Sequence, residues 1–132
     1  VDQDGNELAG IQMPLISVPL ASYTGWSLRH ANIGGTGQTL ASGGATGGTL
    51  LGSTIPFPAT REEREATGDP RLSIEERYAS KDSYLDRISQ SAQQLINQNY
   101  MLSEDLDRVI DQASEHYDEL SSRVRQTQAA DD

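Results

Sequence analysis

The chain changes its chemistry near residue 60, and this change limits how each part can fold. Residues 1–60 hold 11 of the 12 glycines but only 4 charged side chains, whereas residues 61–132 hold 1 glycine and the other 26 charged side chains. Glycine destabilises helices and favours turns and loops. Charges interleaved with periodic apolar residues are typical of amphipathic helices. The sequence therefore predicts an α+β chain that is mainly α, with an irregular β and loop half followed by helices.

The same change of composition predicts three segments within one unit. Residues 1–33 form a strand and turn segment, residues 34–53 a glycine-rich loop, and residues 54–132 a helical segment. A short internal repeat lies in the loop, where positions 34–43 align with positions 44–53. Two such copies are too few and too short for a solenoid, which needs three or more longer repeats.

Two short strands are expected in the first segment, at 8–13 and 14–23. Ile16, Val18 and Leu20 recur at every second position, which is the period of a half-buried strand. Prolines within this stretch lack an N–H donor, so the strands should lie at a sheet edge or be broken.

The start of each short helix in the second half is marked by a capping box. Thr60 precedes Glu63 by three positions, and Ser73 precedes Glu76 in the same way. In this motif the hydroxyl and the carboxylate satisfy exposed backbone N–H groups reciprocally. Asp69-Pro70 separates the two helices, because proline disfavours helix at the preceding residue.

Two longer helices follow from the spacing of apolar residues. One is expected at 81–99, and the next is expected to begin at a capping Ser103. Their apolar positions recur at intervals of three and four, which indicates one buried stripe on each helix. The link at 97–102 is short, so the two helices are expected to pack as a C-terminal antiparallel hairpin.

Net charge and composition exclude several classes of partner. The formal charge is −10, with 20 acidic and 10 basic residues, and nucleic-acid binding depends on clustered Lys and Arg. No window approaches the roughly 20 apolar residues that cross a bilayer, so no membrane partner is expected. The chain has no cysteine, which excludes disulfides, thiolate metal sites and a cysteine nucleophile. None of this indicates a cellular compartment.

Recognised cofactor and metal motifs are also missing from the sequence. A calcium loop counted from Asp2 would require Gly at position 7 and Glu at position 13, where Glu7 and Met13 stand. We interpret residues 2–6 as a turn between strands. The glycine-rich segment is not followed by the lysine of a phosphate loop, because Lys81 is the only lysine. We therefore expect no cofactor and no metal.

A serine-hydrolase triad cannot be assembled from a recognisable motif in this sequence. No Gly-x-Ser-x-Gly elbow occurs. The two histidines are His30, beside the glycine-rich loop, and His116, at the boundary of the last helix's apolar stripe. A small independent enzyme using either histidine is a remote alternative, and we predict no catalytic residue here.

One cluster has the composition of a ligand site. Tyr23, Trp26 and Arg29 lie close together in the sequence, around a glycine that permits a turn. Aromatic rings with a single arginine can line a pocket for an organic ligand. The alternative is that Trp26, the only tryptophan, is a core anchor. We take these three residues as the candidate substrate-binding set.

Seven motifs in order resemble one bacterial family. They are Asp4-Gly-Asn-Glu7 with Ala9-Gly-Ile11, Val18-Pro-Leu20, Tyr23-Thr-Gly-Trp-Ser-Leu-Arg29, Gly52-Ser-Thr-Ile-Pro-Phe-Pro58, Thr60-Arg-Glu-Glu-Arg64, Gly68-Asp-Pro-Arg71 and Ser73-Ile-Glu-Glu-Arg-Tyr78. This order is similar to the C-terminal region of the bacterial alpha/beta hydrolase domain-containing proteins. The chain departs from the family pattern at 30–51, where members have a shorter and less glycine-rich connection.

The resemblance implies a serine hydrolase of ester-like substrates, with its nucleophile and histidine base upstream of this region. We therefore expect this chain to be an accessory C-terminal part of an α/β-hydrolase fold. Its expected partners are the catalytic domain of the same protein and a small ester substrate. The chain opens at Val1 without a leader-like segment, and we expect it to be a piece of a larger protein.

A second hypothesis remains open from the residues alone. The helical hairpin could form a stand-alone interaction module that binds another protein without catalysis.

Overall fold

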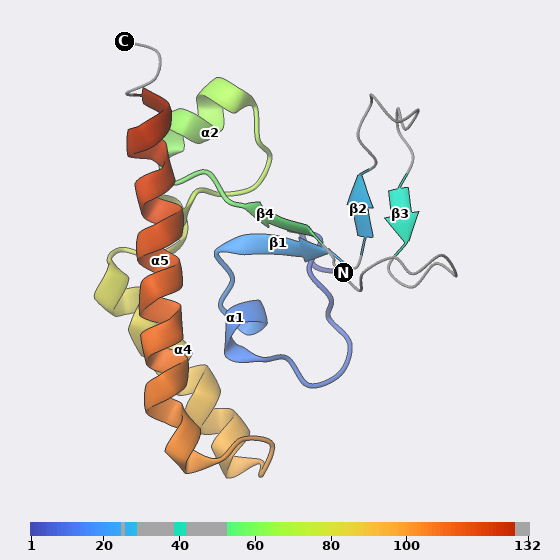
Figure 1. The fold of residues 1–132 in the computed structure, drawn as a ribbon, viewed down its shortest axis with the longest axis vertical. Coiled ribbons are helices and arrows are strands. Elements are labelled where there is room, and N and C mark those ends of the chain that lie inside the picture. The colour runs from blue at the N-terminus through green and yellow to red at the C-terminus, as the bar shows by residue number, and fades with distance from the viewer. Residues whose placement is uncertain (25, 29–38, 42–52, 129–132) are drawn as a thin grey trace.

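The computed structural model describes residues 1–24, 26–28, 39–41 and 53–128, with side chains at 1–24 and 54–122 (Figure 1). Along the chain the elements are α1 (Pro14–Ser17), β1 (Ala21–Thr24), β2 (Trp26–Leu28), β3 (Thr39–Ala41), β4 (Ser53–Pro56), α2 (Arg61–Thr67), α3 (Ile74–Arg77), α4 (Lys81–Asn97), the 3₁₀ turn η2 (Ser103–Asp105) and α5 (Leu106–Gln128). The protein is thus α+β and mainly α, as the change of composition near residue 60 predicts.

The strands pair in two small antiparallel sheets. β1 pairs with β4, with Ala21 opposite Pro56 and Thr24 opposite Ser53, while β2 pairs with β3. In Figure 1 the β2–β3 ribbon stands apart from the helices, beyond the end of β1. A two-stranded sheet is at best marginally stable on its own. The β1–β4 sheet therefore depends on the helices and side chains that contact it.

The expected strands at 8–13 and 14–23 are largely wrong. Residues 8–13 belong to no strand or helix, Pro14–Ser17 is a helical turn, and only Ala21–Thr24 is a strand. Pro14 stands at the first helical position, where its fixed φ fits and its missing N–H costs no hydrogen bond. The alternation at 16–20 thus reflects one helical turn followed by a bent connection to β1.

The two capping sequences do start helices, in slightly different ways. The hydroxyl of Ser73 accepts the N–H of Glu76 at 3.3 Å, and the Glu76 carboxylate accepts the N–H of Ser73 at 3.0 Å. At α2, Thr60 accepts the N–H of Glu63, but the Glu63 carboxylate accepts the N–H of Ala59 instead. Only the Ser73–Glu76 pair is therefore a complete capping box.

The capping box makes the stability of the fold depend on pH in the acidic range. The N–H of Ser73, which donates to the carboxylate, lowers the pKa of Glu76 from 4.5 to about 2. Because the pKa is lower in the folded state, this stabilisation is present above about pH 4.5 and is lost as the pH falls towards 2. The urea midpoint of Glu76→Gln should consequently fall less than that of the wild type between about pH 5 and pH 2.

The control for this prediction is Glu65→Gln, which removes a carboxylate that is 57% exposed and paired only with Arg61. This variant should keep the wild-type dependence on pH. The prediction would be contradicted if the urea midpoints of the wild type and of Glu76→Gln fell equally over this pH range.

The main core lies between α4, α5, α3 and the residues just before β1 and just after β4. α4 and α5 lie side by side and run in opposite directions, since Lys81 at the start of α4 contacts Asp118 late in α5 at 2.6 Å (Figure 1). The core side chains come from segments that are far apart in the sequence: Val18, Leu20, Phe57, Ile74, Tyr78, Tyr84, Ile88, Ala113 and Leu120.

The start of the last helix differs from the prediction. The side chain of Ser103 does not cap α5; instead Ser103 begins the turn η2, which follows Leu102 and leads directly into Leu106. The acidic side chains of this first turn, Glu104 and Asp105, stand near the positive end of the helix dipole. These charges favour the helix start where the hydroxyl cap is missing.

Candidate functional site

The predicted ligand cluster lies only partly within the described residues. Tyr23 lies in β1 and is half-buried, and Trp26 lies in β2, where only the backbone is described. Arg29 and His30 lie outside the described residues, as does most of the glycine-rich loop.

Tyr23 instead meets His116, which sequence analysis placed at the boundary of the helix stripe. The phenol oxygen lies 3.1 Å from Nε2 of His116, across the junction between β1 and α5. Burial raises the pKa of Tyr23 to about 12, so the hydroxyl stays protonated at neutral pH. One of these two groups can donate a hydrogen bond to the other, and this bond joins α5 to β1.

A second group of polar residues was not anticipated from the sequence, and it begins at Asn6. Asn6 is only 1% exposed, and its amide bonds to β1 as a neighbouring strand would. Its Nδ2 donates to the carbonyl of Ala21 at 3.1 Å, and its Oδ1 accepts the N–H of Tyr23 at 2.6 Å. These backbone groups point away from β4, because successive residues of a strand bond to opposite sides. Asn6 thus closes the outer edge of β1.

A turn at residues 2–6 presents Asn6 in this position. The Asp2 carboxylate accepts the N–H groups of Asp4 and Asn6 at 2.9 and 2.8 Å. Gly5 has φ 84°, a conformation that costs glycine little. The expected turn therefore forms, although no strand flanks it on either side.

Two arginines complete this group, one at the N-terminal turn and one at β4. Arg77 makes a two-pronged ion pair with Asp4 at 2.8 and 2.5 Å, and its guanidinium carbon lies 3.9 Å from the centre of the Phe57 ring. Arg71 pairs with Asp69 in the same way and also donates to the carbonyl of Pro56 at 3.2 Å. We call Asn6, Asp4, Phe57, Asp69, Arg71 and Arg77 the anchor network.

The anchor network is suited to joining segments rather than to binding an anion. Each guanidinium is already matched by a carboxylate, and the Arg77 and Asp4 side chains are only 16% and 12% exposed. A desolvated charge that has its counter-charge leaves no net positive centre for a substrate. The network links the N-terminal turn, β4 and α3, which come from distant parts of the chain.

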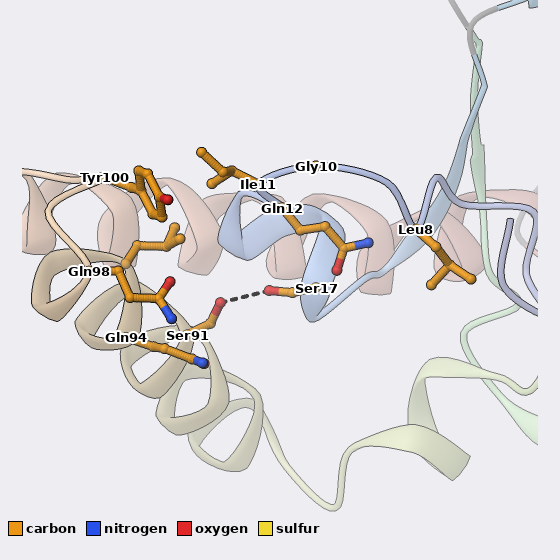
Figure 2. Close-up of a pocket in the computed structure, with 10 residues that line it drawn as sticks. Leu8, Gly10, Ile11, Gln12, Ser17, Ser91, Gln94, Gln98 and Tyr100 are labelled. Atoms are coloured by element: carbon orange, nitrogen blue, oxygen red, sulfur yellow. Dashed lines mark hydrogen bonds between the residues drawn. The ribbon is translucent and has the colours of Figure 1, made fainter.

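The described chain also has a groove, shown in Figure 2. It has a volume of about 340 Å³ and lies between the N-terminal segment, α1 and α4. Its lining has no charged residue, and the hydroxyls of Ser17 and Ser91 meet across it at 2.6 Å. Such a groove provides neutral donors, neutral acceptors and apolar contacts, but no acid or base for catalysis.

Other site classes can be assessed for the described part of the chain. There, no three His, Asp or Glu side chains gather closely enough to hold a metal ion. Within the same ranges, none of the helices is long and apolar enough to span a membrane.

Comparison with known proteins gives one family match. A family model described as "Alpha/beta hydrolase domain" matches residues 1–111. The search of curated proteins and the search of solved structures found no match. The matched range includes the whole anchor network and Tyr23, but it ends before His116. Because the match covers most of its length, the chain belongs to the alpha/beta hydrolase domain family.

Proposed function

We propose that this chain is an accessory segment of a larger bacterial α/β hydrolase, which cleaves ester substrates with a serine nucleophile located outside the chain. The segment packs on the catalytic domain as its C-terminal part. It contributes structure and a pocket wall rather than the reacting groups.

The main support for this proposal is the number and direction of the strands in the two sheets. An α/β domain is built on a mostly parallel sheet with helices on its faces. Both strand pairs in the described residues are antiparallel and two-stranded. A family member of this form is best explained if the catalytic sheet, with its nucleophile and base, is supplied by another region. The missing Gly-x-Ser-x-Gly elbow supports the same conclusion.

The test of the accessory role uses the 132-residue chain and the coding region before Val1. A fluorophosphonate probe, which labels activated serines, should leave the chain unlabelled, and p-nitrophenyl acetate should be hydrolysed no faster than in buffer. The region upstream should encode, in frame, a nucleophile elbow and a later histidine. A labelled serine within the chain, or an upstream region without these features, would overturn the proposal.

Tyr23, Trp26 and Arg29 are proposed to wall the ester pocket in that larger protein. If they contact the bound ester but not the reacting atoms, Trp26→Ala should raise KM several-fold and change kcat little, since it removes uniform binding. Trp26→Phe should restore most of the affinity. A fall in kcat at unchanged KM would contradict a wall role for this residue.

A further inference from the structure

Two of the uncharged stretches of this chain meet in the structure. No residue from 8 to 28 or from 88 to 103 is charged, although charged residues make up 23% of the sequence. The structure brings parts of these two stretches together at the groove in Figure 2. The surface they share is formed by Leu8, Ile11, Gln12, Gln94, Gln98 and Tyr100, which we call the neutral face.

The neutral face has the composition of an interface centre. Leu8, Ile11 and Tyr100 are 61%, 56% and 59% exposed, so each presents apolar surface to solvent. Interface centres are depleted in charge and enriched in aromatic residues. Between these side chains, Figure 2 shows Gln12, Gln94 and Gln98 with their amide groups along the groove. An amide both donates and accepts, so the groove can bond to backbone groups of a partner.

The surroundings of the face indicate the charge of that partner. Glu7 precedes Leu8 directly, Glu104 lies in η2 and Asp107 at the start of α5; all three are exposed. The basic residue beside them, Arg108, pairs with Asp105 at 2.5 Å, so these surroundings are acidic on balance. Two copies of the chain meeting symmetrically would bring these acidic groups together, which is unfavourable. A partner with an uncharged centre and basic residues around it would complement the face.

We propose that the neutral face is the surface by which this segment docks on the catalytic domain of the larger hydrolase. This inference rests on the proposed function and adds the location of the contact. The partner surface is an uncharged patch of exposed backbone and apolar side chains, bordered by Lys or Arg.

Hydroxyl-radical footprinting with mass spectrometry tests the contact without any substitution. Tyr100 and Ile11 should be labelled strongly in the 132-residue chain and several-fold less in the intact larger hydrolase. Leu72, which is 48% exposed and lies outside the face, is the internal control and should be labelled equally in both proteins.

A matched pair of variants tests the role of charge. Gln94→Glu places a carboxylate in the groove, whereas Gln93→Glu places one on the same helix but outside the lining of the groove. Both variants put a negative charge near the end of α4, and Gln93→Glu additionally loses the bond that Gln93 Nε2 donates to Oδ1 of Asn97 at 3.1 Å, so this control carries the larger local cost. In the intact hydrolase, only Gln94→Glu should return the labelling of Tyr100 towards that of the free chain.

The outcomes separate this inference from the function on which it rests. If the upstream region encodes the hydrolase but Tyr100 is labelled equally in both proteins, the docking surface is wrong and the accessory role stands. Protection of Tyr100 that grows with the concentration of the free chain would assign the face to a second copy and overturn the inference. An upstream region without a hydrolase would overturn both.

Discussion

Replacing Arg77 with alanine should lower the free energy of unfolding by about 3 kcal/mol, because it leaves the mostly buried Asp4 carboxylate without its counter-charge. The substitution also removes the bond from Arg77 Nε to the carbonyl of Leu72 at 2.9 Å and the stacking on Phe57. Urea unfolding followed by circular dichroism would measure the change.

The control for Arg77 is an arginine whose ion pair is exposed. Arg61 pairs with Glu65 at 2.8 Å, but the two side chains are 68% and 57% exposed. Exposed pairs contribute little, so Arg61→Ala should cost less than about 0.5 kcal/mol. If Arg77→Ala and Arg61→Ala lower the free energy of unfolding equally, burial is not the reason why the Asp4–Arg77 pair stabilises the fold.

Replacing Asn6 with alanine should lower the free energy of unfolding by a similar amount, about 3 kcal/mol. The variant leaves the carbonyl of Ala21 and the N–H of Tyr23 without the partner that now covers them, and each such loss costs roughly 1–3 kcal/mol. Amide exchange at Tyr23 should accelerate more than exchange in the middle of α4, because the damage is local to β1.

Asn6→Asp tests the donor to Ala21. It retains an oxygen that can accept the N–H of Tyr23 but replaces the Nδ2 donor by a second carboxylate oxygen, which faces the carbonyl of Ala21. Because Asn6 is only 1% exposed, the ionised carboxylate would be buried without a counter-charge, so at neutral pH this variant should cost at least as much stability as Asn6→Ala. Asn97→Ala at the exposed end of α4 is the matched control and should change stability by less than about 0.5 kcal/mol. If Asn6→Ala leaves the free energy of unfolding unchanged, Asn6 is not needed to complete the sheet.

The helices could be predicted from the sequence because their determinants are local. Ile88, Ala92 and Leu95 recur at helical spacing, and all three are buried on α4. The hydroxyl–carboxylate pair at Ser73 and Glu76 spans a single turn, so the beginning of α3 is specified by four consecutive residues.

The N-terminal half could not be predicted in the same way, because its conformation depends on residues far along the chain. Asn6 is held by β1, and Asp4 is held by Arg77, 73 positions later. Before the fold is known, Asp2 to Glu7 looks like any polar turn. The motif order that marks family membership contains these residues, but spacing alone gives no sign that they meet.

The candidate site shows the same limit. Proximity in sequence suggested Tyr23 as a pocket residue, yet its described partner is His116, 93 positions away on α5. A tyrosine and a histidine at such a separation carry no shared motif. Their contact depends on how α5 packs on the sheet, which long-range geometry decides.

The partly covered edges of the β1–β4 sheet have a consequence for the chain before it meets any partner. An open strand edge is a template on which other chains can add strands and aggregate. Here the Asn6 amide occupies the free side of β1, while on β4 Pro56 has no N–H and its carbonyl is taken by Arg71. A newly made molecule that carries exposed apolar side chains, such as Tyr100, therefore presents fewer free backbone groups on this sheet to which another chain could add a strand.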